Sequence, residues 1–110
     1  MKAVNNKIKG IDESLLPQIL DLILKYKKPE KIVIFGSRAS DNFEDTSDID
    51  IAIFGKDWTD KDINMVKYNL DEFVKTPLKF DLLNFYKIGK TKLKENILKE
   101  GKIIYEIRKD

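Results

Sequence analysis

The sequence predicts an α+β (α/β) domain in which helices pack on a mixed β-sheet. Four short apolar runs have the alternation and the Gly or Pro boundaries of strands, and segments between them have helical apolar spacing. The link between the first two strands is short, which favours an antiparallel pair. A helix fits between the second and third strands, which permits a parallel pair with a right-handed crossover. We therefore expect one mixed sheet covered by helices.

The first half of the chain predicts a helix followed by a strand. Ser14 is a candidate N-cap, and Pro17 is tolerated in the first turn of a helix. The apolar positions with helical spacing are Leu15, Ile19, Ile23 and Tyr26. The helix is expected to end at Lys27-Lys28-Pro29, and Lys31–Phe35 is the first strand.

The second half predicts three strands and two helices. The second strand runs from Ile49 to about Phe54, and Thr59 to Asp62 has the pattern of a capping box. The apolar stripe of the following helix is Ile63, Val66, Leu70, Phe73 and Val74. The remaining predicted elements are a strand over 79–85, a helix over 91–100 that ends at Gly101, and a strand over 102–107.

Composition limits the chemistry. The 110 residues predict a single domain, 1–110, and contain no histidine and no cysteine. Catalytic triads that use histidine, Cys-His dyads and ordinary zinc sites are therefore excluded. No apolar stretch approaches the length of a membrane span and no signal peptide is evident, so we expect a cytoplasmic protein. The net charge is +2 with both signs interspersed, so we do not expect direct nucleic-acid binding. The lysines from Lys79 onward are interpreted as solvated surface, with a contact surface for an acidic partner or a nucleotide as the alternative.

Three aspartates are candidates for a metal site. Asp48 and Asp50 precede and enter the second strand, and alternation places both on the face opposite Ile49. Two adjacent carboxylates repel each other unless a cation lies between them, and magnesium prefers such oxygen ligands. Asp81 lies within the apolar third strand, where it needs a partner or a metal. If the two strands are neighbours, the three carboxylates converge, and one can act as a base or bridge a second metal.

Gly36, Ser37 and Arg38 follow the first strand and are candidates for phosphate binding. Glycine allows close approach to the backbone, and the hydroxyl and helical amides after it can hold phosphate oxygens. Arg38 can neutralise a triphosphate, or it can form a surface salt bridge with Glu44 or Asp45. Taken alone, a Gly-Ser pair after a strand is commonly only a turn. Its occurrence together with the three aspartates favours metal-assisted phosphoryl or nucleotidyl transfer.

These residues resemble a known family. Gly36-Ser37-Arg38-Ala39 together with Ser47-Asp48-Ile49-Asp50 is similar to the signature of the polymerase-β-type nucleotidyltransferases, and above all to the minimal nucleotidyltransferases (MNT). The resemblance implies that Asp48, Asp50 and Asp81 are the metal-binding and catalytic acids, with Mg²⁺ or Mn²⁺ as cofactor. It implies that the segments with Gly36, Ser37, Arg38 and Ser47 bind the nucleotide, ATP. Ser40-Asp41 departs from the Arg-Gly that is frequent in the family, which puts nucleotide affinity in question.

The resemblance also implies a partner. Minimal nucleotidyltransferases commonly pair with a helical HEPN-domain toxin as its antitoxin, and some transfer AMP to a tyrosine of that toxin. AMP transfer to a HEPN tyrosine, in a homo- or hetero-oligomer, is therefore the leading hypothesis. Two alternatives stay open: nucleotidyl transfer to a small molecule, and a nucleotide-binding subunit without turnover. Three intact acids count against the last, and Ser40-Asp41 counts mildly for it.

Overall fold

The computed structural model describes Ile8, residues 11–36, Ala39 and residues 48–107. Its helices are α1 (Leu15–Tyr26), α2 (Asp60–Phe73), α3 (Thr91–Glu100) and a short 3-10 helix η2 (Phe85–Lys87). Its strands are β1 (Lys31–Phe35), β2 (Ile49–Phe54), β3 (Phe80–Asn84) and β4 (Lys102–Glu106). The predicted order of elements is confirmed. None of these helices is long and apolar enough to cross a membrane.

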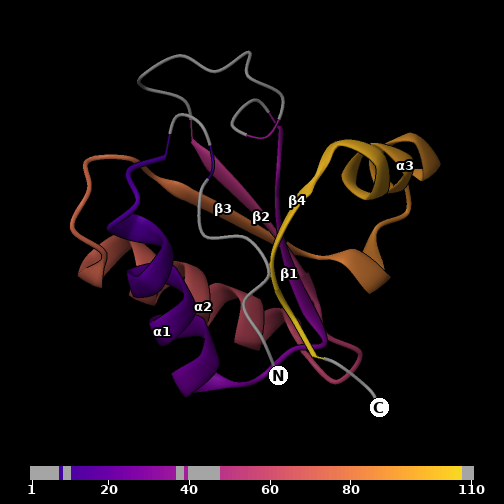
Figure 1. The fold of residues 1–110 in the computed structure, drawn as a ribbon. Helices are drawn as coiled ribbons and strands as arrows, with labels where there is room; N and C mark the ends of the chain where they lie inside the picture. The colour runs from indigo at the N-terminus through magenta and orange to yellow at the C-terminus, as the bar shows by residue number, and fades with distance from the viewer. Residues whose placement is uncertain (1–7, 9–10, 37–38, 40–47, 108–110) are drawn as a thin grey trace.

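The four strands form one mixed sheet in the order β3-β2-β1-β4. β1 pairs antiparallel with β2 and with β4, and β2 pairs parallel with β3. The predicted antiparallel and parallel pairs are therefore both confirmed. Figure 1 shows α1 and α2 together on one face of the sheet and α3 on the other.

Alternation along β2 divides the core between the two faces of the sheet. Ile49, Ile51 and Ile53 are fully buried in the larger core, which α1 and α2 cover. Ala52 and Phe54 belong to a smaller core under α3. Asp50 shares the face of Ala52, as alternation predicts. Its carboxylate therefore lies on the side of the sheet that the smaller core only partly covers.

Some details of the elements differ from the prediction. Phe73 is 63% exposed, because the buried stripe of α2 ends with Leu70 and continues at Val74 after the helix. Ser14 occupies the N-cap position of α1, but its side chain makes no capping bond. Asp12 acts there instead, since its side chain accepts the Ser14 N–H at 2.9 Å and its carbonyl accepts the Leu15 N–H at 2.9 Å.

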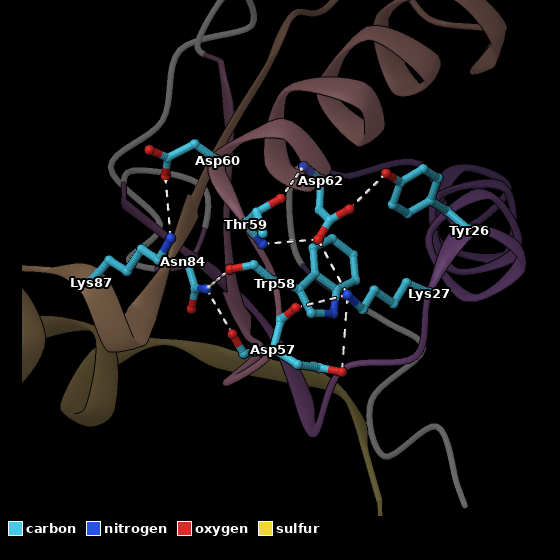
Figure 2. A network of polar contacts seen from close by, with 10 residues as sticks. Tyr26, Lys27, Asp57, Trp58, Thr59, Asp60, Asp62, Asn84 and Lys87 are labelled. Carbon is cyan, nitrogen blue, oxygen red and sulfur yellow. Dashed lines mark hydrogen bonds and ion pairs between the residues drawn. The ribbon is translucent and has the colours of Figure 1, made fainter.

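A polar network holds the start of the crossover helix α2 (Figure 2). The predicted capping box is confirmed: Thr59 Oγ1 accepts the Asp62 N–H at 3.2 Å, and Asp62 Oδ2 accepts the Thr59 N–H at 2.8 Å. The same carboxylate accepts hydrogen bonds from Tyr26 Oη at 2.7 Å and Lys27 Nζ at 3.2 Å. The backbone N–H of Thr59 is the main reason that the pKa of Asp62 lies well below its usual range. The network thus joins the end of α1 to the start of α2.

Asn84 joins the end of β3 to the same region. Its side-chain amide is buried and donates to the carbonyl oxygens of Gly55 at 2.7 Å and Trp58 at 3.2 Å. A buried amide without partners would cost free energy, so these bonds fix the loop after β2 against the end of β3. The two parallel strands are thereby held in one register, and that register sets which residues meet at their opposite ends.

Candidate functional site

The candidate site forms where β1 ends and where β2 and β3 begin. Phe35 at the end of β1 pairs with Asp50 at the start of β2, and Asp50 pairs in turn with Asp81 on β3. Residues paired across neighbouring strands have side chains on the same face. The structure therefore places Asp50 and Asp81 side by side, as we expected if β2 and β3 were neighbours.

The three predicted acids differ in their exposure. Asp50 is partly buried, whereas Asp48 and Asp81 are exposed. The expectation that Asp81 is desolvated within an apolar run is wrong, because β3 is the terminal strand and α3 leaves this end of it uncovered. Asp81 therefore needs no partner to offset desolvation. It is accessible to a substrate.

Negative charge is crowded around the partly buried Asp50. Burial, and to a smaller extent the negative charges of Asp81 and Asp48, together raise its pKa to about 6. Both neighbours therefore lie close enough for their charges to act on Asp50. A group in such a position favours either a proton or a cation at neutral pH.

Gly36, the residue directly after β1, lies against the Asp50 carboxylate. Its φ is +75°, a conformation that glycine adopts readily, and the Ala39 N–H donates to its carbonyl at 3.1 Å. A Cβ at this position would overlap Oδ2 of Asp50 and lie 3.2 Å from its Cγ. Only a residue without a side chain therefore allows the backbone of the Gly36 turn to lie against Asp50.

Gly36→Ala is expected to damage both the fold and the site. The positive φ costs about 1 to 2 kcal/mol for a residue with a Cβ, and the overlap with Asp50 adds to that cost. We expect a lower urea midpoint and a loss of activity. The matched control for stability is Gly89→Ala, because a Cβ at Gly89 meets no atom within 4 Å. Equal stability of the two variants would contradict the close contact between Gly36 and Asp50.

The donor set is suitable for a hard divalent cation. Carboxylate oxygens are the ligands that Mg²⁺ and Mn²⁺ prefer, and Asp50 lies in a position that a cation would stabilise. No group of three or more Asp or Glu side chains is already gathered around one point among the residues that the structure describes. A cation held by Asp48 and Asp50 would therefore take its other ligands from substrate oxygens or water. The metal role of the three acids stays a prediction.

Three of the predicted nucleotide-binding residues cannot be placed. Ser37, Arg38 and Ser47 lie outside the described residues. Their roles stay predictions, as does the salt bridge considered for Arg38. Gly36 and Ala39 on either side of Ser37 and Arg38 are described, and their hydrogen bond closes the turn that the sequence predicted after β1.

Two features near the site were missed in the sequence. Asn84 was treated as part of an apolar strand, although a polar residue at the end of such a run is a signal for a buried hydrogen bond. Lys87 and Lys90 are exposed, which agrees with their interpretation as solvated surface, but the sequence does not show that both line a cavity beside β3. No local pattern distinguishes them from the other lysines of that region.

The family comparison agrees with this geometry. Residues 17–110 match the family model described as "Polymerase beta, Nucleotidyltransferase". The chain belongs to the polymerase beta nucleotidyltransferase family. It is therefore a nucleotidyltransferase by family, and the sequence resemblance is confirmed at that level. No curated protein matches the chain.

Solved structures share the nucleotidyltransferase fold. A toxin–antitoxin crystallised with AMP-PNP has a TM-score of 0.66 and 23% identity, with 84% of this chain and 74% of that chain covered. The complex of a tri-AMPylated Shewanella oneidensis HEPN toxin with MNT antitoxin has a TM-score of 0.63 and 22% identity, with 88% of this chain and 74% of that chain covered. A putative nucleotidyltransferase from Sulfolobus solfataricus has a TM-score of 0.53 and 20% identity, with 84% of this chain and 81% of that chain covered. At these identities the likeness shows the fold alone.

Proposed function

We propose that this chain transfers AMP from ATP to a tyrosine hydroxyl of a HEPN-domain partner and acts as the antitoxin of that partner. The observation that carries the proposal is the position of Asp50 between Gly36 and Asp81, at the end of the sheet where β1 ends and β2 and β3 begin. A turn suited to phosphate, a crowded carboxylate and an accessible carboxylate are parts that nucleotidyl transfer needs, and they support the proposal. The AMPylated HEPN toxin in the complex with the MNT antitoxin supports the choice of acceptor.

Each residue has a role in the proposed reaction. The turn that starts at Gly36 holds the triphosphate, and Asp81 accepts the proton of the acceptor hydroxyl. Asp48 and Asp50 hold the divalent cation, which when bound neutralises charge on the triphosphate. The hydroxyl oxygen forms a bond to the α-phosphorus while the bond from that phosphorus to the bridging oxygen breaks. Pyrophosphate leaves with the electron pair of that bond, and AMP remains on the acceptor.

The test of this function is the fate of the label from ATP. With Mg²⁺ or Mn²⁺ and a HEPN-domain protein encoded by the adjacent gene, label from α-labelled ATP should appear on the partner. Label from γ-labelled ATP should not, because pyrophosphate carries the γ-phosphate away. Intact-mass spectrometry should show the addition of one or more AMP groups.

Two results would refute the proposal. Transfer of γ-label to the partner would indicate a kinase. If the partner binds but gains no mass, while the hydroxyl of a small molecule is modified efficiently, the chain is a small-molecule nucleotidyltransferase. A tyrosine-to-phenylalanine change at the modified position of the partner is the control for the acceptor group.

A further inference from the structure

A cavity of about 450 Å³ lies beside the outer edge of β3. Its volume is within the range of about 300 to 1,000 Å³ that is usual for ligand-binding sites. Leu82 and Leu83, whose side chains point to opposite faces of the sheet, both line it. The cavity therefore runs alongside the edge of the strand, and the start of α2 and the segment that leads into α3 form its other walls.

The backbone of β3 is oriented toward this cavity. β3 is a terminal strand of the sheet, and its only paired neighbour in the described sheet is β2. The Ile49 N–H donates to the Lys79 carbonyl at 3.0 Å, so odd-numbered residues of β3 face β2. Because backbone groups alternate between the two sides of a strand, the N–H and C=O of Leu82 face outward. The outward N–H of Phe80 is already bonded to Asp71 Oδ1 at 3.0 Å. The outward positions next to the cavity are therefore Leu82 and Asn84, and Leu82 is the one nearer to Asp81.

The same strand leads directly to Asp81. Leu83 lines the cavity, shares the face of Asp81 and follows it by two residues. At the rise of an extended strand the two side chains are separated by about 7 Å. A segment that pairs with Leu82 would therefore carry a neighbouring side chain to the Asp81 carboxylate.

The charge at the cavity rim indicates what kind of segment fits. The charged residues that line the cavity are Lys87, Lys90 and Asp60. Lys87 Nζ is 3.6 Å from the exposed Asp60 carboxylate, which partly neutralises both charges. Lys90 forms no ion pair with any residue that the structure describes, so the lining keeps a net positive charge at Lys90. The floor is apolar and includes Ile63 and Leu93. An extended segment with an apolar or aromatic side chain and acidic neighbours complements both the floor and the rim.

We propose that the free edge of β3 and its cavity form the acceptor-binding site, which takes an extended, acidic, tyrosine-bearing segment by strand addition. The proposal rests on the proposed function and specifies its acceptor class. The segment pairs with Leu82, its acidic side chains face the lysines, and its tyrosine oxygen reaches Asp81. Nucleotide binding at the Gly36 turn is separate from this site.

The probe is a random copolymer of glutamate and tyrosine, with a copolymer of lysine and tyrosine as the control for charge. Binding of the acidic copolymer to wild-type protein is measured by fluorescence anisotropy, with no nucleotide present. The Leu82 amide should become protected from hydrogen exchange when the acidic copolymer is added. Equal binding of the two copolymers, or an unprotected Leu82 amide, would overturn the proposal.

Two variants test the cavity. Gly89→Phe adds a side chain where there is open space, and we expect copolymer affinity to fall at least about tenfold. Lys90→Glu should lower it about fivefold, the upper range for an exposed charge pair. The matched control is Lys92→Glu, because Lys92 is exposed on the same segment but does not line the cavity. Its affinity should stay close to that of the wild type.

ATP binding and AMP transfer separate this inference from the proposed function. Affinity for ATP should be the same in wild type, Gly89→Phe and Lys90→Glu, and a loss of ATP affinity would assign the cavity to the nucleotide and overturn the proposal. If AMP is transferred to the HEPN partner with the same KM in all variants, the function stands and the acceptor site is wrong. If the acidic copolymer binds as expected but no AMP transfer to any protein occurs, the site stands and the function is wrong.

Discussion

Asp50→Asn should reduce AMP transfer at least about 100-fold, because it removes a proposed ligand of the catalytic cation. The same change should raise the melting temperature of the metal-free protein. Asp50 is partly buried and lies beside two other carboxylates, so its charge opposes folding when no cation is present. An amide of nearly the same shape removes that charge. A variant that is more stable and inactive is the expected combination.

The stability gain should depend on pH in a defined direction. The folded-state pKa of Asp50, about 6, lies above 3.8, the ordinary value for an aspartate, which applies to the unfolded chain. The folded protein therefore binds this proton more tightly, and the associated stability is complete below about pH 3.8 and lost as pH rises to about 6. Since the group is partly solvated, we expect the loss to be about 1 to 2 kcal/mol. Urea unfolding of wild type and Asp50→Asn from pH 4 to 8 measures it.

Two further variants control this result. Asp48→Asn should also abolish transfer but gain less stability, because Asp48 is exposed. Asp21→Asn makes the same charge change on the exposed face of α1, where Asp21 forms an ion pair with Lys25 at 3.1 Å, and should retain full activity. Wild-type rates in Asp50→Asn would refute the metal-site assignment. If the free energy of unfolding of the wild type does not change with pH from 4 to 8, the claim that the Asp50 charge opposes folding is wrong.

Much of this arrangement could be predicted from local sequence. Alternation along β2 places Asp50 opposite Ile49, and the length of the α2 crossover permits the parallel pair that brings Asp81 beside Asp50. The capping box at Thr59 and the strand Lys31–Phe35 were also predicted correctly, since each depends on neighbouring residues alone. Such features are set by backbone geometry within a few residues.

Features that depend on distant parts of the chain could not be predicted. Whether Asp81 is buried depends on the order of the strands, and the position of β3 at the sheet edge leaves it exposed. Phe73 continues the apolar spacing of α2 but meets no neighbouring element that buries it. The overlap that a side chain at Gly36 would make with Asp50 follows from the pairing of β1 with β2, which local patterns do not encode in atomic detail.

The second large effect is expected from Asp81→Asn, which should lower kcat for AMP transfer by about 10² to 10⁴, the usual contribution of a general base. Asp81 is exposed, and in the proposed reaction it accepts a proton only as the acceptor hydroxyl attacks. An interaction made in the transition state appears in turnover, whereas ATP binding depends on the Gly36 turn and the cation. Affinity for ATP should therefore change by no more than about twofold.

Single-turnover kinetics with saturating ATP, together with equilibrium binding of ATP, separates these two quantities. The matched control is Asp57→Asn, because the Asp57 side chain is 78% exposed in the loop after β2, beyond the opposite end of the strand from Asp50. That variant should keep both the turnover and the ATP affinity of the wild type. If Asp81→Asn instead loses ATP binding and turns over normally at saturation, Asp81 belongs to the nucleotide site and is not the base. The acceptor hydroxyl would then have to lose its proton to another group, and the placement of the acceptor along β3 would lose its chemical basis.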